Sequence, residues 1–139
     1  MFNPNVVVKN LSQQPQVNAV LSLVARILMA YIFIVAGWGK ISGYAATAGY
    51  MESMGVPAAL LPLTILVELG GGLALLFGFQ ARLAALGLAV FSLITAFIFH
   101  GAAEDAINLM KNLAMSGGLF FLVLHGAGKL SLDHLIENK

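Results

Sequence analysis

Cysteine is absent from this chain of 139 residues, and charged residues make up only 9% of it. Without cysteine, the chain alone can form no disulfide, no thiolate metal site and no dithiol relay. Its seven basic and six acidic residues are spread along the sequence, so there is neither a basic tract nor an acidic tail. We therefore exclude nucleic acid as a partner, and the absence of paired metal-ligand spacings predicts no metal site.

Apolar side chains are abundant, by contrast. They account for 60% of the residues, and the mean hydropathy is +0.92. Soluble domains carry roughly 45 to 50% apolar and about 25% charged residues. A soluble fold of this length could not bury so much apolar surface, so the lipid bilayer must solvate most of it.

The apolar residues are concentrated in four runs, each near the roughly 20 residues that cross a bilayer as a helix. The runs are 17–38, 61–79, 83–100 and 107–125. They predict an all-α integral membrane protein, a bundle of four transmembrane helices. The predicted parts are a cytoplasmic N-terminal segment 1–16, a transmembrane domain 17–129 and a cytoplasmic C-terminal tail 130–139.

The loops give an orientation and one further element. Lysine and arginine are slightly more frequent on the side of the two termini, which the positive-inside rule places in the cytoplasm. The longest connection, 39–60, has Tyr44, Ala48 and Met51 at helical spacing before Gly55 interrupts the pattern. We expect a short helical segment in this first outer loop, with an ordinary ordered loop as the alternative.

Arg26 and Glu68 are the two charges that hydrocarbon should reject most strongly. A charge at the bilayer centre costs at least about 2.5 to 3.5 kcal/mol, so both should face the bundle interior. From the helical rise, they lie roughly 13 and 19 Å from the same membrane face. We therefore predict an Arg26–Glu68 ion pair, which either belongs to a ligand site or only fixes helix packing.

Three more polar residues lie toward the outer face of the predicted bundle: Lys40, His100 and Asn112. Together with Arg26 and Glu68 they are the candidate ligand-binding residues. Two of them have simpler explanations, because Lys40 could extend to the lipid headgroups and His100 could sit at the interface.

The same inventory argues against self-contained catalysis. The histidines lie at different depths, which excludes a bis-histidine haem within one chain, and no catalytic residues can be named. Binding of an apolar molecule with a polar head, such as a quinone, is compatible with the polar residues, because its carbonyls could accept hydrogen bonds from them.

Several short motifs occur in a characteristic order along the chain. They are Arg26-Ile27-Leu28-Met29, Ala36-Gly37-Trp38-Gly39-Lys40, Tyr50-Met51-Glu52, Glu68-Leu69-Gly70-Gly71-Gly72 and Met110-Lys111-Asn112. In their order and spacing they resemble the DoxX family, over nearly the whole chain after its first twenty residues.

The resemblance implies a small multi-pass protein of the bacterial inner membrane. Members of the family are associated with quinol oxidase and thiosulfate:quinone oxidoreductase complexes. This implies an accessory or quinone-binding subunit of a membrane redox system, with no covalently bound cofactor and with a redox protein or further copies of the chain as partners. The alternatives are a non-enzymatic interaction or assembly protein with a structural Arg26–Glu68 pair and, ranked last, a solute or proton pathway.

Overall fold

The computed structural model describes residues 1–139, all of them in helices or the connections between helices. Four helical segments are long and apolar enough to cross a membrane. They are Pro15–Ser42, Ala58–Phe77, Ala81–Phe99 and Ala103–His125. The prediction of an all-α membrane bundle with four transmembrane helices is therefore confirmed.

The first and third spans are single helices, α2 (Pro15–Ser42) and α6 (Ala81–Phe99). The second span changes its winding along its length, from η1 (Ala58–Leu60) and α4 (Leu61–Ile65) through η2 (Leu66–Gly70) to α5 (Gly71–Phe77). The fourth span consists of a short turn, η3 (Ala103–Asp105), and α7 (Ala106–His125). Three shorter helices lie outside the spans: α1 (Pro4–Ser12), α3 (Tyr44–Ser53) and α8 (Leu132–Glu137).

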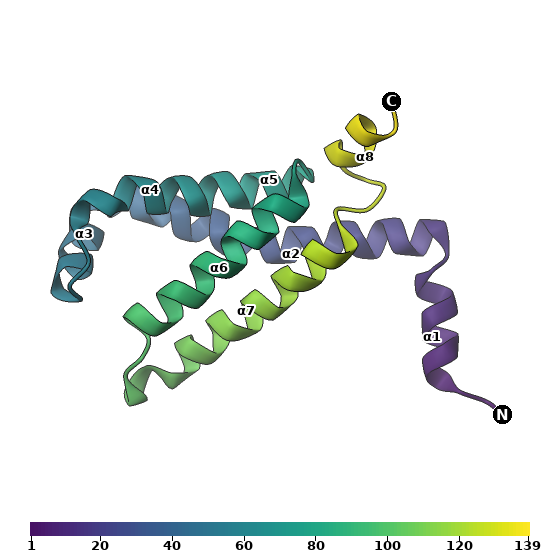
Figure 1. The fold of residues 1–139 in the computed structure, drawn as a ribbon, viewed down its shortest axis with the longest axis horizontal. Helices are drawn as coiled ribbons and strands as arrows, with labels where there is room; N and C mark the ends of the chain where they lie inside the picture. The colour runs from purple at the N-terminus through teal and green to yellow at the C-terminus, as the bar shows by residue number, and fades with distance from the viewer.

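The spans are arranged as two helix pairs that cross each other (Figure 1). In one pair α2 runs beside α4 and α5, and in the other α6 runs beside α7. Both chain termini lie at the same end of the bundle, while α3 and the α6–α7 connection lie at the opposite end. This common location agrees with an even number of spans, and the assignment of that end to the cytoplasm stays a prediction.

The helix predicted in the first loop is confirmed as α3. Met51 anchors it, with only 4% of its surface exposed. The helix ends where Gly55 adopts a positive φ of 78°, a conformation that glycine tolerates without strain. The chain then enters the second span through Pro57, which precedes η1.

Small side chains allow the helices to approach closely. Ala81, Ala85 and Ala89 on α6 are completely buried. Between α2 and the second span, a methyl group added at Gly72 would lie 2.9 Å from the side chain of Ile34, and one at Gly37 would lie 2.9 Å from the backbone of Leu69. Membrane helices pack through such small residues because lipid supplies little hydrophobic driving force between them.

The second span contains a π-helical turn, η2, with Glu68 at its centre. A π turn adds a residue to the local winding and rotates everything beyond it around the helix axis. For this reason the face that packs on α2 cannot be read from a regular 3.6-residue period along this span. Turns of this kind occur often at functional sites, which draws attention to Glu68.

The end of the bundle near the termini is held by side chains that cap helices. Arg82 donates hydrogen bonds from Nη1 to the carbonyls of Val123 and Leu124 in the last turn of α7, at 2.6 and 2.7 Å. Asp133 accepts hydrogen bonds from the backbone N–H groups of Gln80 and Ala81 at the start of α6. The residues following α7 therefore fasten the connection between α5 and α6, because a carboxylate satisfies and electrostatically favours a helix N-terminus.

Candidate functional site

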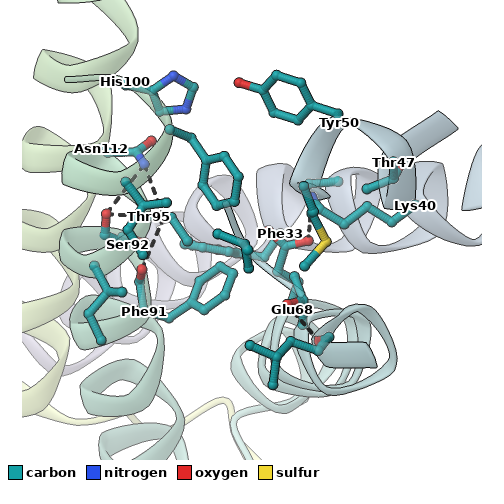
Figure 2. Close-up of a pocket in the computed structure, with 18 of the residues that line it drawn as sticks. Phe33, Lys40, Thr47, Tyr50, Glu68, Phe91, Ser92, Thr95, His100 and Asn112 are labelled. Carbon is teal, nitrogen blue, oxygen red and sulfur yellow. Dashed lines mark hydrogen bonds and ion pairs between the residues drawn. The ribbon is translucent and has the colours of Figure 1, made fainter. Parts of the chain in front are cut away.

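A pocket of about 660 Å³ lies within the half of the bundle that carries α3 (Figure 2). All four spans and α3 contribute to its wall, and 13 of its 21 lining residues are hydrophobic. Four of the five candidate residues line it, namely Lys40, Glu68, His100 and Asn112. Residues that the sequence spaced far apart thus share one cavity, and Arg26 lies outside it.

Lys40 and Glu68 form an ion pair on one wall of the pocket. The Nζ atom of Lys40 lies 2.8 Å from Oε2 of Glu68, and the two side chains are 26% and 9% exposed. Lys40 belongs to the last turns of α2, which extends to Ser42, and Glu68 comes from the π turn of the neighbouring span. A carboxylate has several lone pairs on its two oxygens, so Glu68 can hold Lys40 and still accept a hydrogen bond from a ligand.

The predicted Arg26–Glu68 pair is wrong. Arg26 is completely buried, and its Nη1 donates to the carbonyls of Leu75 and Leu76 at 2.9 Å each, while Nη2 donates to the carbonyl of Leu130. The first two carbonyls belong to the last turn of α5, and the third belongs to the segment after α7. Arg26 therefore joins α2 to the end of α5 and to the C-terminal segment.

The physical reason for this arrangement is the supply of acceptors. The last carbonyls of a helix carry a partial negative charge and can accept further hydrogen bonds, so Nη1 of Arg26 finds acceptors there without a carboxylate, while its Nε has no partner. These carbonyls lie about two helical turns beyond Glu68. Glu68 is instead reached by the long flexible side chain of Lys40 from the other direction.

The facing wall of the pocket is built by α6 and α7, with Ser92, Thr95 and Asn112. The Nδ2 atom of Asn112 donates to the carbonyl of Ser92 and to the hydroxyl of Thr95, both at the long distance of 3.3 Å. Ser92 is 1% exposed, and its hydroxyl is buried without a hydrogen-bond partner. A buried hydroxyl without a partner is costly, and because Ser92 lines the pocket, rotation of its side chain would let a ligand supply one.

His100 and Tyr50 lie at the end of the pocket nearest the α6–α7 connection, facing one another in Figure 2. The ring of Tyr50 stacks on Phe99, with 5.6 Å between the ring centroids. The Nδ1 atom of His100 contacts the carboxylate of Asp105. The sequence analysis missed this carboxylate, which lies five residues after His100 in the helix connection, because a connection follows no regular helical period.

Aromatic rings separate the two polar walls. Phe33 and Phe91 lie in the middle of the pocket, between the Lys40–Glu68 wall and the Ser92–Asn112 wall (Figure 2). Such a cavity suits a flat apolar group with polar atoms at opposite ends. The sequence pointed to Lys40, Glu68, His100 and Asn112, but it missed Ser92, whose only signal was a hydroxyl inside an apolar run.

Known proteins resemble the chain over most of its length. The DoxX family model matches residues 21–101. The inner membrane protein YqjF of Escherichia coli strain K12 is 56% identical over 120 residues, covering 84% of this chain and 92% of that protein. The inner membrane protein YphA of the same strain is 32% identical over 124 residues, covering 82% and 89%.

A third relative, from Bacillus subtilis strain 168, carries the name "Putative oxidoreductase CatD" and is 31% identical over 109 residues, which cover 71% of this chain and 81% of that protein. No solved structure gives a significant match. Two of these relatives are named inner membrane proteins, and the chain has four helices able to span a membrane. The chain is a multi-pass inner-membrane protein, and it belongs to the DoxX family.

Proposed function

We propose that this protein binds a quinone in the pocket between its helix pairs and serves as an accessory subunit of a membrane redox system. The observation that carries the proposal is the pocket itself, about 660 Å³ in volume and lined by Lys40, Glu68, Ser92, His100 and Asn112 among mainly apolar residues. Its volume lies within the roughly 300 to 1,000 Å³ of ordinary small-molecule sites.

The shape of the polar surface fits the chemistry of a quinone head group. A quinone has two carbonyls on opposite sides of a flat apolar ring, and the pocket has polar side chains on two facing walls with Phe33 and Phe91 between them. Lys40 can donate to one carbonyl, and Asn112, or Ser92 after rotation of its side chain, can donate to the other. The apolar tail of such a molecule would remain among lipid-facing side chains, where the bilayer solvates it.

The redox centre in this proposal belongs to another protein. The chain has no cysteine, and its own residues bind, orient and shield the ligand instead of exchanging electrons with it. Glu68 is the group that would accept a hydrogen bond, and then a proton, from a ring hydroxyl. Support for a redox setting comes from the relative named "Putative oxidoreductase CatD". The names of YqjF and YphA give only their location in the inner membrane.

Equilibrium binding of a short-chain quinone to the purified protein in lipid nanodiscs tests the proposal. Glu68→Gln, Ser92→Ala and Asn112→Leu remove polar groups of the pocket, and each should weaken binding by about tenfold or less, the effect of one or two hydrogen bonds. Glu52→Gln is the matched control, because Glu52 is an exposed acid of α3 outside the pocket.

Equal affinity in all the variants would remove the pocket from the proposal, and no binding by the folded wild type would end it. Native mass spectrometry of the gently purified protein adds an independent readout through co-purifying quinones and proteins. Recovery of a stable protein complex that never contains quinone would favour the assembly function instead.

A further inference from the structure

Asp105 holds the imidazole of His100 at the end of the pocket. The Nδ1 atom of His100 lies 2.5 Å from Oδ2 of Asp105, and the other carboxylate oxygen accepts a hydrogen bond from Nδ2 of Asn108. Lys111 donates in turn to the amide oxygen of Asn108 at 3.3 Å. His100 and Asn108 therefore hold the carboxylate from two sides, and the carboxylate in turn fixes the orientation of the His100 ring.

This contact decides what His100 offers to a ligand. An ionised carboxylate can only accept hydrogen bonds, so the hydrogen of a neutral imidazole lies on Nδ1 and the lone pair on Nε2. Nε2 has no hydrogen-bond partner within the chain, and His100 lines the pocket opposite Tyr50. Histidines whose second nitrogen donates to a carboxylate are held in one tautomer in the same way at metal sites.

We infer that Asp105 is a positioning residue that makes His100 a hydrogen-bond acceptor, so that the pocket favours the reduced, dihydroxy form of a quinone over the oxidised form. The inference rests on the proposed quinone site and names the ligand form that this site prefers. A hydroxyl donates to Nε2, whereas a carbonyl there would meet lone pair against lone pair. Glu68 provides a second acceptor on another wall, so both ends of a dihydroxy ring find a partner.

The test compares the affinities of the reduced and the oxidised form of one short-chain quinone for the protein in nanodiscs, without oxygen. The wild type should bind the reduced form about fivefold more tightly, the effect of one hydrogen bond. Asp105→Ala should bring the two affinities close together, because the tautomer of His100 is then free. Glu104→Ala is the matched control, since Glu104 is the neighbouring exposed acid and lies outside the pocket.

His100→Ala provides a second variant in case the first one unfolds, and it should also abolish the preference. Equal binding of both forms by the wild type, or an unchanged preference in Asp105→Ala and His100→Ala, overturns the inference and leaves the quinone site intact. Failure of the folded wild type to bind either form would count against the proposed function itself.

The N-terminal helix α1 is not covered by any other part of the chain. None of its residues is buried. At about 100° per residue, Pro4, Val7, Val8 and Leu11 fall on one face, and the polar residues fall on the rest of the surface together with a single valine, Val6. Val7, Val8 and Leu11 are 43%, 62% and 49% exposed.

We propose that α1 lies in the membrane surface, with Val7, Val8 and Leu11 in the lipid and Lys9 toward the headgroups. The helix ends only a few residues before Pro15, where the first span begins, and it runs across the direction of α2 in Figure 1. Because α2 spans the membrane and begins only a few residues after α1, α1 lies at the membrane surface. Short amphipathic helices with a lysine on the polar face bind there through their apolar side.

The absence of cysteine makes this proposal simple to test, because each introduced cysteine is the only thiol in the chain. An environment-sensitive dye attached at Val7→Cys should be quenched by spin-labelled lipids in nanodiscs, whereas the same dye at Lys9→Cys, about 160° around the helix from Val7, should be quenched much less. Equal quenching at the two positions overturns the proposal. So does shielding at Val7→Cys that appears only at high protein concentration, since a second copy of the chain would then cover this face.

Discussion

The ammonium group of Lys40 lies 2.8 Å from the carboxylate of Glu68, and the pair joins the end of α2 to the π turn of the second span. This relationship replaces the predicted pair of Arg26 with Glu68, and it moves the opposite charges into the wall of the pocket. Because both residues line the pocket, a ligand there can contact the pair, whereas a charge pair buried between two packed helices would be out of its reach.

The Lys40–Glu68 pair should contribute to the stability of the folded protein. Lys40→Met should lower the free energy of unfolding by about 2 kcal/mol, because Glu68 would be left as a buried charge without a partner. The measurement is reversible unfolding in mixed detergent micelles. In the double variant Lys40→Met with Glu68→Gln, most of the lost stability should return. Strictly additive losses would show that the two residues do not interact.

Arg26 should matter for stability and not for ligand binding. Arg26→Lys keeps the charge, but one ammonium nitrogen replaces the two guanidinium nitrogens that reach α5 and the segment after α7. The variant should therefore lower the free energy of unfolding by about 2 kcal/mol and leave quinone affinity unchanged. Arg82→Lys is the comparison, since Arg82 caps α7 in the same way but is exposed. Arg82→Lys should lower the free energy of unfolding by less than Arg26→Lys does. Reduced affinity in a stable Arg26→Lys protein would return Arg26 to the ligand site.

Two buried serines should behave in opposite ways. Ser92 and Ser116 are each 1% exposed, but only Ser116 has partners, the carbonyls of Ala89 and Asn112 at 3.2 and 2.9 Å. Ser116→Ala should therefore cost about 1 kcal/mol of stability. Ser92→Ala should keep or slightly raise stability while weakening quinone binding. Comparison of unfolding and binding for both variants checks this, and equal behaviour would contradict it.

The glycine contact between α2 and the second span should tolerate no methyl group. Gly72→Ala places a carbon 2.9 Å from the side chain of Ile34 and should cost about 1 to 3 kcal/mol through overpacking. Gly87→Ala is the matched control, because nothing lies within 4 Å of its added carbon. That variant should be neutral or more stable, since alanine favours helix. Equal losses would show that the close approach is absent.

The residues that the sequence singled out are those whose chemistry conflicts with lipid. Lys40, Glu68, His100 and Asn112 stood out because polar side chains within or beside apolar runs are expensive, and the folded chain gathers all four around one pocket. Ser92 gave too weak a signal, because a single hydroxyl in an apolar helix usually bonds to its own backbone.

The sequence by itself determined the number of spans, the all-α class and the short helix of the first loop, because bilayer thickness and helical periodicity act on local runs of residues. Only the tertiary structure decided the partners of Arg26 and Glu68. From the sequence, Arg26 could bind either a carboxylate or the carbonyls at the end of a helix. Which of the two it binds depends on where α5 ends and on how the π turn rotates Glu68. Both depend on contacts between segments far apart in the chain, which no local pattern records.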